Sequence, residues 1–568
     1  MGKKGTNKGV YICDFETANN ATLNATETYV WLGVAIEMES EQVRCVAHSV
    51  EEFYSWFTSL KGGKFYFHNL AFDGNFLLAY LLKTGFVPYD GKNRDKTFEV
   101  ICDDFNRIFR LRVSLKVQQK LRTWTFYDSL KIIPLSERDM GKKFSLSTQK
   151  GEIDYTLPRP KGYIATAEEV SYCINDVKMV AEALKYFEHQ GWLTGFTIGM
   201  ISFHEFKETC PEWRYRFPKL TTDVDSYVRR AYRGGISYAN PHFAGKTVGE
   251  GQVFDANSLY PSQMLLKPMP TGFPRWFKGK PDLASGRLFV CHFTASFSIK
   301  PDHMPMLQLK QSVMFNPREF ITEAPEPTDL YLCTPDFETF FEQYNVYDIT
   351  WIDGYYFESC EHVFDKFIHK FQTIKENNKG ALRQIAKLIL NNLYGKFGTN
   401  PTRWSKTPTL DNGKVTFLID GMEQIDPVYI PVAVFITAYG RRELVHNIQA
   451  NFHRFLYCDT DSIHILGREP PKNVKVDDKK FGFWKCESRF VQGKYLRAKT
   501  YVEDMIDYES SSFVAIHTEV KCAGMPYEVK KHIKFEDFKY GAKFTGKLAR
   551  KAVIGGVILR ETTFEIKE

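Results

Sequence analysis

Two carboxylates stand in the middle of an apolar stretch that runs Phe455-Leu456-Tyr457-Cys458-Asp459-Thr460-Asp461-Ser462-Ile463-His464-Ile465. The apolar residues on both sides predict two short strands, so the acids would occupy the turn of a β-hairpin. Charge in such a place is unfavourable unless cations neutralise it. A D-T-D-S tetrad alone is also typical of an ordinary Asx turn. Whether this tetrad marks a cation-binding site or an ordinary turn therefore depends on the rest of the chain.

A second acid and an unusual helix also indicate a functional site rather than an ordinary turn. Upstream, Val253-Phe254-Asp255 places a carboxylate after a β-like pair. The stretch Ala381–Phe397 predicts a helix whose apolar stripe contains Leu382, Ile385, Ala386, Ile389 and Leu393. At about 100° per residue, four other side chains fall within an arc of roughly 80° on the opposite face. They are Arg383, Lys387, Asn391 and Tyr394. This stripe contains no acid, which suits a triphosphate and a base.

The N-terminal third carries another group of carboxylates. Asp14 and Glu16 lie two apart on a predicted strand and point to one side. Asp73 follows His68-Asn69, and Tyr172 and Asp176 share one face of a predicted helix that starts with a Thr166–Glu169 capping box. Each piece alone is typical of a solvated surface. Together, four carboxylates can hold two Mg²⁺ or Mn²⁺ ions, which stabilise the attacking and leaving oxygens of phosphodiester hydrolysis.

In this order and spacing, the N-terminal group resembles the three exonuclease motifs of proofreading DNA polymerases. The resemblance implies that Asp14, Glu16, Asp73 and Asp176 bind the metal ions, and that Tyr172 orients the attacking water. It implies that Lys150 steadies the departing phosphate, while Glu152 stands where close relatives have Asp. Contacts to a frayed 3′ end would come from Thr17, Tyr66, His68, Asn69, Phe72, Phe76, Ser129 and Leu130. Aromatic faces in such a cleft stack on bases of any sequence.

The later group resembles the polymerase motifs of the family B DNA polymerases. The resemblance implies that Asp255 and Asp461 bind two catalytic ions, with Asp459 as an auxiliary carboxylate. The incoming nucleotide and the template would be contacted by Ser258, Leu259, Tyr260, Lys375, Arg383, Lys387, Asn391, Tyr394 and Gly395. Lys499-Thr500-Tyr501 matches a K-x-Y motif near the primer terminus, and Tyr232–Gly235 matches a Y-x-G-G element that links the two active sites. Cys458 and Asn392 depart from the wider family without removing a needed group.

The branch that fits best is that of the protein-primed replicases of small tailed bacteriophages. It implies a multidomain α/β and α+β fold, in which an RNase H-like 3′→5′ exonuclease precedes a right-hand polymerase with two insertions. The implied order is exonuclease 1–195, first palm part 196–266, insertion lobe 267–364, fingers 365–399, second insertion 400–427, second palm part 428–526 and thumb 527–568. The first insertion would bind a terminal protein and DNA, and the second would serve processivity and strand displacement.

Implied partners are template-primer DNA, dNTPs, a terminal protein that acts as primer, and phage proteins that bind single- or double-stranded DNA. We expect a monomer in the host bacterial cytoplasm. An ordinary primer-dependent proofreading polymerase is the first alternative. A stand-alone exonuclease would leave Asp255, Asp461 and the Lys387 helix unexplained, and a non-enzymatic ssDNA-binding protein has no use for so many acids at motif spacing.

Composition sets wider limits. The chain has 568 residues, enough for several domains, and a net charge of +7 that fits a nucleic-acid partner without requiring one. Its 11 cysteines form no C-x-x-C pair, which argues against a zinc module, and the longest apolar run is too short to predict a membrane span. Ten of 25 prolines fall between Pro268 and Pro335, so no long helix is expected there. Strand signals dominate Val428–Thr437.

Overall fold

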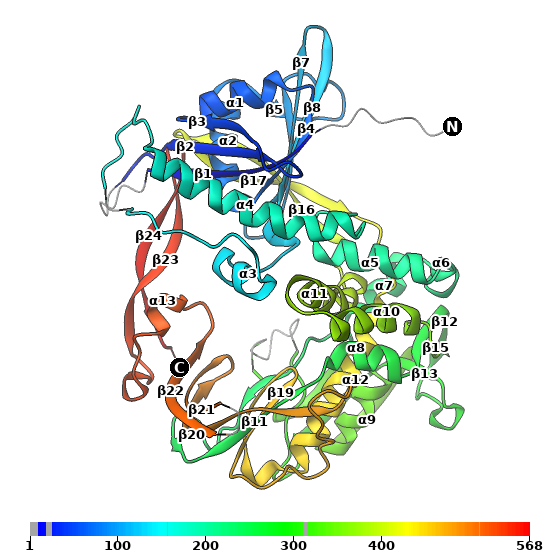
Figure 1. Ribbon diagram of the computed structural model, residues 1–568. Coiled ribbons are helices and arrows are strands. Elements are labelled where there is room, and N and C mark those ends of the chain that lie inside the picture. The colour runs from blue at the N-terminus through cyan, green and yellow to red at the C-terminus, as the bar shows by residue number, and fades with distance from the viewer. Residues whose placement is uncertain are drawn as a thin grey trace.

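The computed structural model describes residues 9–18, 25–155, 157–309, 316, 319–509 and 512–567. These residues form two eight-stranded sheets, one four-stranded sheet and two separate two-stranded hairpins. The two large sheets lie at opposite ends of the molecule with a layer of helices between them (Figure 1). This arrangement of α/β and α+β parts confirms the predicted fold class. Among the described residues, no helix has both the length and the hydropathy that a bilayer crossing requires.

The first large sheet is mixed and has the strand order β3-β2-β1-β4-β8-β7-β6-β5. Its strands are β1 (Val10–Thr17), β2 (Val30–Glu37), β3 (Val43–Ala47), β4 (Gly63–Phe67), β5 (Val87–Pro88), β6 (Thr97–Cys102), β7 (Ile108–Val117) and β8 (Lys120–Asp128). Helices α1 (Val50–Ser59) and α2 (Leu70–Lys83) cover one face, and α4 (Ala167–His189) covers the other. Along β1, Ile12 packs with the α4 side, so Asp14 and Glu16 share its direction. The predicted capping box is present at Thr166.

The second large sheet has the order β22-β21-β20-β11-β19-β18-β9, with β10 paired to β20. Its strands are β9 (Ser237–Ala239), β10 (Thr247–Val248), β11 (Gly251–Ala256), β18 (Phe455–Asp459), β19 (Ser462–Leu466), β20 (Trp484–Arg497), β21 (Thr500–Glu509) and β22 (Ser512–Cys522). The predicted acidic hairpin is confirmed, because Asp459 pairs with Ser462 and leaves Thr460 and Asp461 in the turn. Helix α8 (Leu259–Leu266) follows β11 directly. The sheet therefore brings Asp255 and the acidic turn side by side.

The strand that we predicted for Val428–Thr437 is wrong, because Ile430–Gln449 forms helix α12. Every residue from Ile430 to Ala438 is buried, and Pro431 lies in the first turn, where it needs no hydrogen-bond partner. A helix that is buried on all sides lacks a polar stripe. The periodicity that separates helix from strand is then missing, and the β-branched residues Val432, Val434 and Ile436 favoured the wrong element.

The lobe between the palm segments and the helices beside it complete the core. The four-stranded sheet has the order β12-β15-β13-β14, and the described part of the proline-rich stretch contains no long helix, as predicted. Its elements are β12 (Met269–Lys278), β13 (Leu288–Ile299), β14 (Glu323–Cys333), α9 (Thr334–Gln343) and β15 (Tyr344–Cys360). The remaining helices include α3 (Glu137–Phe144), α5 (Ile198–Thr209), α6 (Trp213–Arg216), α7 (Thr222–Arg229), α10 (Asp365–Asn377), α11 (Gly380–Phe397) and α13 (Tyr527–Lys530).

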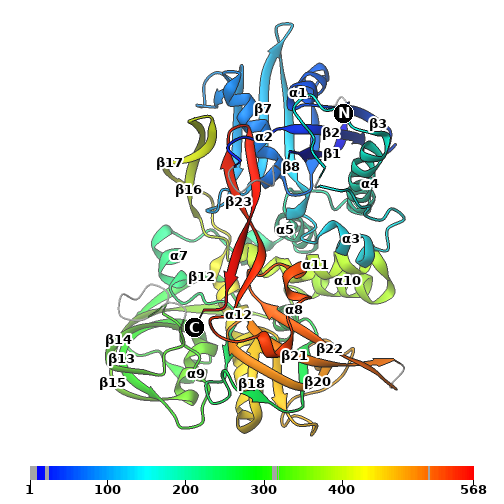
Figure 2. The same ribbon diagram turned by 90° about the vertical axis from the view of Figure 1, so that its left-hand side faces the viewer.

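Two hairpins extend to the first sheet from different parts of the chain (Figure 2). One consists of β16 (Thr402–Asp411) and β17 (Lys414–Gln424), and the other of β23 (Lys543–Val553) and β24 (Gly556–Glu565). Asn412 and Gly413 have φ values of 48° and 75°, so the predicted two-residue turn is present. At the tip of the C-terminal hairpin, the Ile554 amide donates to Thr26 O (3.0 Å), and Ile554 O accepts from the Thr28 amide (2.9 Å). Ile554 also forms a bridge with Lys414, so the two hairpins meet beside the first large sheet.

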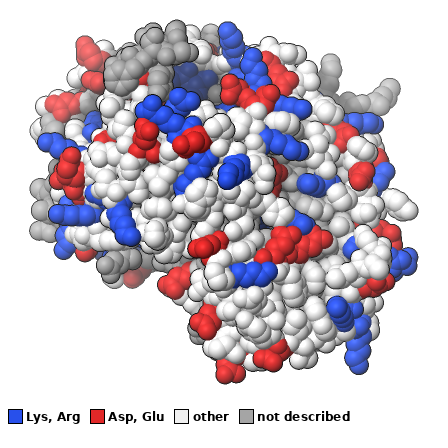
Figure 3. All heavy atoms as spheres, turned by 90° about the horizontal axis from the view of Figure 1, so that it is seen from below, with Lys and Arg blue, Asp and Glu red and all other residues white. Residues whose placement is uncertain are grey.

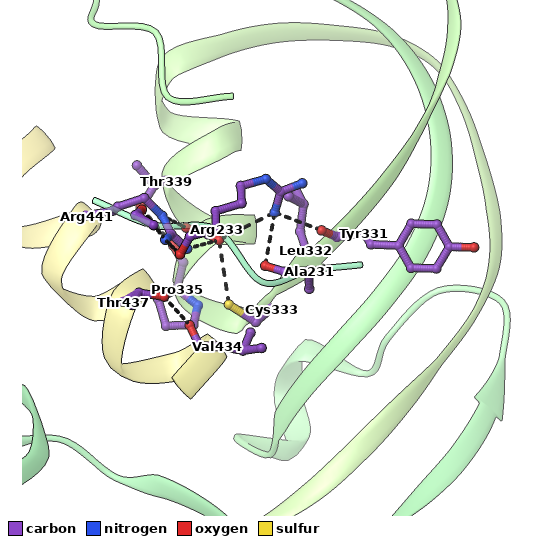
Figure 4. Close-up of polar contacts among 12 residues, drawn as sticks. Ala231, Arg233, Tyr331, Leu332, Cys333, Pro335, Thr339, Val434, Thr437 and Arg441 are labelled. Carbon is purple, nitrogen blue, oxygen red and sulfur yellow. Dashed lines mark hydrogen bonds and ion pairs between the residues drawn. The ribbon is translucent and has the colours of Figure 1, made fainter. Parts of the chain in front are cut away.

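A buried ion network fastens the lobe to the palm (Figure 4). Asp336 on α9 accepts two hydrogen bonds from Arg441 on α12, at 3.1 and 2.6 Å, and lies 3.7 Å from Arg233. Arg441 also donates to the carbonyls of Arg233 and Gly234, and Arg233 donates to the Tyr331 carbonyl at 3.0 Å. All three charged side chains are buried. The segment that contains Tyr232–Gly235 is therefore held by Asp336 and Tyr331 of the lobe and by Arg441 of α12.

We predict that Asp336→Asn destabilises the protein strongly, because it leaves two buried guanidinium groups without their anion. Breaking a buried pair in this way costs about 3–5 kcal/mol. The loss is measured as the shift of the urea unfolding transition, followed by near-ultraviolet circular dichroism. Asp426→Asn is the matched control, since its carboxylate is 84% exposed and forms a surface ion pair with Lys219. A transition for Asp336→Asn that coincides with that of the control contradicts the role given to the network.

Candidate active sites

The first candidate site is a cavity of about 540 Å³ at one edge of the exonuclease sheet. Its acids come from three elements: Asp14 and Glu16 from β1, Asp73 from the start of α2, and Asp176 from α4. The turn before α2 is fixed by Asp128, which accepts hydrogen bonds from the Asn69 amide (2.9 Å) and the Leu130 amide (3.0 Å). The four predicted carboxylates are therefore brought together by the fold.

These acids are strongly perturbed. Burial, followed by the neighbouring carboxylates, raises the pKa of Asp14 and Asp73 well above the ordinary range, and burial raises the pKa of Glu16 to about 8. One cation opposes them: Lys150 binds Asp176 at 2.9 Å and also binds Glu137. The second oxygen of Asp176, Oδ1, is buried and has no hydrogen-bond partner. Desolvated carboxylates with an unpaired oxygen suit hard divalent cations, so the residues present fit such ions.

The other predicted exonuclease residues divide into two sets. Thr17, His68, Asn69, Phe72 and Lys150 line the cavity with the acids. Tyr66, Phe76 and Ser129 are buried behind it, and Leu130 is half-buried. Ser129 is 3.0 Å from His68 Nδ1, so it orients that ring rather than facing the cavity. Tyr172 lies beside the cavity, where its hydroxyl is 3.2 Å from that of Tyr155, in a hollow shared with Glu152.

Sequence patterns did not reveal several residues of this site. Glu137 and Tyr155 lie between the recognised motifs and line the cavity. Arg550 of β23 also lines it and donates to Asn69 Oδ1 at 2.7 Å. The C-terminal hairpin thus forms one wall of a cavity whose acids stand at the other end of the chain. Only long-range folding brings these groups together, and no local pattern could have indicated it.

The second candidate site lies where β11 meets the acidic turn. Asp255 pairs with Ser462, and the Ala256 amide donates to Asp461 O at 2.8 Å. Burial, and then the charges of Asp461 and Glu487, raise the pKa of Asp255 to about 7, against the opposing effect of Lys485 and Lys387. Burial also raises the pKa of Asp461. The charged form of Asp255 is disfavoured by burial and by Asp461, and that of Asp461 by burial and by Asp459, so these two carboxylates too fit divalent cations. Lys485 and Glu487 were not recognised from the sequence.

Cations and aromatic rings form the opposite wall of this site. On α11, Arg383, Lys387 and Asn391 are exposed along the predicted polar stripe, together with Gly395. Lys375 donates to Ser258 Oγ at 3.1 Å, and Arg383 donates to the Lys375 carbonyl at 2.8 Å. Burial, and then the charges of Arg383 and Lys387, lower the pKa of Lys375. The positive charges of Lys375, Arg383 and Lys387 are therefore close enough to disfavour one another.

Tyr260 is enclosed at the base of the site. Its ring lies 4.4 Å from that of Tyr394, while Leu259 next to it is buried in the core. A Cβ added at Gly440 would lie 3.0 Å from the Tyr260 ring, and one added at Gly235 would lie 2.9 Å from its hydroxyl. The two glycines thus let α12 and the Tyr232–Gly235 segment approach the tyrosine closely. Its position depends on both.

The K-x-Y residues border a further cavity of about 600 Å³ beside the acidic turn. Lys499 Nζ lies 2.9 and 2.8 Å from the two oxygens of Asp459, so this acid is paired with a lysine rather than free. Tyr501 also lines the cavity, together with Lys521 and Lys530, which sequence patterns did not single out. Basic and acidic side chains are interspersed on the face seen from below (Figure 3). The placement of cations inside the cavities is therefore more informative than the outer charge.

Comparison with known proteins gives a consistent result. Residues 57–165 and 158–480 match a family described as DNA polymerase type B, organellar and viral. The DNA polymerase of Bacillus phage phi29 is 38% identical over 98% of this chain and 99% of its own, and that of Streptococcus phage Cp-1 is 32% identical over 98% of both. A solved structure of phi29 DNA polymerase with primer-template DNA and incoming nucleotide has a TM-score of 0.92 and 37% identity, covering 99% of this chain and 100% of that one. The chain is therefore a DNA-directed DNA polymerase, and it belongs to the type B DNA polymerases of organelles and viruses.

Proposed function

We propose that this polymerase replicates linear phage DNA, starting on a terminal protein, displacing the non-template strand and proofreading its product with a 3′→5′ exonuclease. The observation that carries the proposal is the presence of two separate carboxylate cavities in one chain, one facing a helix of cations and one lined by aromatic and polar groups. A polymerase without proofreading has no use for the first cavity. A nuclease alone has no use for the second.

For synthesis, Asp255 and Asp461 would hold two Mg²⁺ ions, or Mn²⁺ in their place, which supply charge stabilisation for in-line phosphoryl transfer. The triphosphate binds to Lys375, Arg383 and Lys387, because these three positive charges lie close enough to disfavour one another and a polyanion would stabilise them. Tyr260 and Tyr394 position the sugar and base, and Asn391 and Gly395 lie toward the template. Lys499 and Tyr501 hold the primer end, and Lys499 keeps Asp459 beside the turn.

For proofreading, Asp14, Glu16, Asp73 and Asp176 would hold the second pair of ions. Tyr172 orients the attacking water, and Lys150 moves from Asp176 to the departing phosphate. Phe72, His68, Asn69 and Thr17 hold the single-stranded 3′ end in the cavity. Tyr66, Phe76, Ser129 and Leu130 support these contacts from behind. The relatives crystallised with primer-template DNA and with single-stranded DNA favour both substrates.

The domain assignment follows the same division. We assign 1–195 to the exonuclease, 196–266 and 428–526 to the palm, 365–399 to the fingers and 527–568 to the thumb. The lobe 267–364 would bind the terminal protein, and the hairpin 400–427 would encircle and separate DNA together with the thumb tip at Ile554. The enzyme would work as a monomer in the cytoplasm of the infected bacterium, beside phage proteins that bind single- and double-stranded DNA.

The two activities are predicted to separate. Asp255→Ala and Asp461→Ala each remove a metal-binding group, and removal of one such electrostatic group costs about 10²–10³ in rate or more. We expect synthesis on a primed template to be lost while degradation of single-stranded DNA persists. Asp14→Ala combined with Asp73→Ala should have the reverse effect. Loss of both activities in either folded variant refutes the assignment of two sites.

Tyr260 is predicted to exclude ribonucleotides. Its ring is fixed by Tyr394 and Gly440, so a 2′-hydroxyl on the incoming sugar would clash with it. Tyr260→Val should reduce discrimination between dNTP and NTP by roughly 10–100-fold, measured as the ratio of the two kcat/KM values. Tyr260→Phe keeps the ring and should keep the discrimination. Equal ratios in wild type and Tyr260→Val argue against this role.

The hairpin insertion is predicted to be dispensable for chemistry. Deletion of Asn400–Asp426 removes β16, β17 and the bridge from Lys414 to Ile554. It leaves in place every carboxylate assigned to the two active sites. The deleted enzyme should extend a short primed template and lose long synthesis through duplex DNA on a primed circle. Asn412→Asp preserves a favourable residue for the turn and should behave as wild type. Full strand displacement by the deletion variant would eliminate the encircling role.

Priming on protein has its own test. The intact enzyme, given its cognate terminal protein and a labelled dNTP, should transfer one nucleotide to a Ser, Thr or Tyr hydroxyl of that protein. Removal of the lobe 267–364 should abolish this transfer. If no labelled terminal protein forms while primed DNA is extended normally, the enzyme is an ordinary primer-dependent proofreading polymerase.

A further inference from the structure

A cysteine thiol lies among the exonuclease carboxylates. Cys173 follows Tyr172 on α4 and is fully buried. Its Sγ lies 3.8 Å from Asp14 Oδ2 and 4.0 Å from Asp14 O. One ligand atom each from Asp14, Glu16 and Cys173 lie within 4.8 Å of one another. The sulfur is therefore placed where a ligand of an ion bound to these acids would be.

A second observation concerns Asp176, which lies one helical turn beyond Cys173. It is only 3% exposed, yet among the described residues its Oδ1 has no hydrogen-bond partner. Its other oxygen, Oδ2, binds Lys150. Asp176 lines the same cavity as Asp14 and Glu16. A buried carboxylate oxygen without a partner is unfavourable unless a donor or an ion meets it. The cavity that these acids line therefore favours the binding of a cation.

The ligand set distinguishes two classes of ion. Mg²⁺ requires oxygen ligands in an octahedron and does not use a thiol. Zn²⁺ and similar soft ions take sulfur at about 2.3 Å and carboxylate oxygen at about 2.0–2.2 Å, so tetrahedral ligand atoms lie about 3.5 Å apart. The observed 3.8 Å between Sγ and Asp14 Oδ2 is within a few tenths of an ångström of that spacing.

We propose that the exonuclease site is also a binding site for a soft divalent cation of the zinc class, held by Cys173 together with Asp14 and Glu16. The thiol proton leaves to solvent as the metal–sulfur bond forms, and no electron is transferred. The inference deepens the proposed proofreading function, on which it rests. A soft ion bound in this way occupies the place of the ions that serve hydrolysis, so it suppresses exonuclease activity before it affects synthesis.

The polymerase site provides an internal contrast. Cys458 precedes the acidic turn and is fully buried like Cys173, but among the described residues the group of ligand atoms close enough to hold an ion contains Cys173 and not Cys458. Cys486, on the strand next to β11, contacts Gln252 and Ser488 instead of Asp255. Soft ions should therefore distinguish between the two carboxylate sites of this chain.

The experiment titrates Co²⁺ and Cd²⁺ into the full-length protein and records the ultraviolet charge-transfer band of a metal–thiolate bond. Wild type should show this band, saturating at one ion per chain. Cys173→Ser should lose it and bind Cd²⁺ at least about tenfold more weakly. Cys13→Ser is the matched control: Cys13 is buried on β1, packs with the opposite core, and should leave the band unchanged. A band that persists in Cys173→Ser, or no band in wild type, overturns the proposal.

A second measurement separates this outcome from failure of the proposed function. Degradation of single-stranded DNA is assayed in Mg²⁺ with wild-type protein, and Zn²⁺ is then added at increasing concentration. Loss of degradation at Zn²⁺ concentrations that leave primer extension intact supports soft-ion binding. Equal sensitivity of the two activities overturns it. If wild-type protein degrades no DNA in Mg²⁺, the exonuclease assignment fails, whereas the charge-transfer band still reports on Cys173.

Discussion

The carboxylate of Asp336 is the single group that the rest of the architecture depends on. It lies between two buried guanidinium groups and comes from the inserted lobe, whereas Arg441 comes from α12 and Arg233 from the segment between α7 and β9. Through Arg441, the same network fixes the carbonyls of Arg233 and Gly234. Gly235 follows directly and packs against Thr460 and Tyr260. The surroundings of Tyr260 and Thr460 are therefore positioned by an acid that belongs to a different part of the fold.

The two active sites handle uncompensated negative charge differently. The N-terminal cavity is lined by five acids, Glu137 among them, and by Lys150 and Arg550, and burial raises the pKa of Asp14, Glu16, Asp73 and Asp176. In the polymerase site two acids face a helix and a neighbouring strand that carry several cations, and the pKa of Asp255 rises to about 7. A metal ion must displace protons from either set, so binding to both should strengthen as pH rises toward neutrality. Lys485 and Lys387 lower that barrier, because their charges oppose the rise in the pKa of Asp255.

Local patterns were informative wherever one face of an element was polar and the other apolar. Helix α11 followed its predicted stripes, and the acidic hairpin and the Asn412–Gly413 turn formed where expected. Pattern failed for α12, which is buried on all sides and offers no periodicity. It also could not distinguish Phe72, which lines the cavity, from Phe76, which is buried behind it. Local pattern could not predict the roles of Glu137 and Arg550, because their place in the site depends on contacts between residues far apart in the chain.

The junction at the tip of the C-terminal hairpin is made almost entirely of backbone groups. Ile554 exchanges main-chain hydrogen bonds with Thr26 and Thr28, and its bridge to Lys414 also involves only main chain. Because main-chain groups are the same in almost every residue, these hydrogen bonds place little constraint on which side chains stand at these positions. Two glycines are exceptions. Gly555 has φ of 86°, and a Cβ there would lie 2.3 Å from Thr28 O. Gly413 has φ of 75°, and a Cβ there would lie 3.3 Å from the Ile554 side chain. Over evolutionary time, selection on this junction should be strongest at these two glycines, because other residues rarely adopt their backbone conformation.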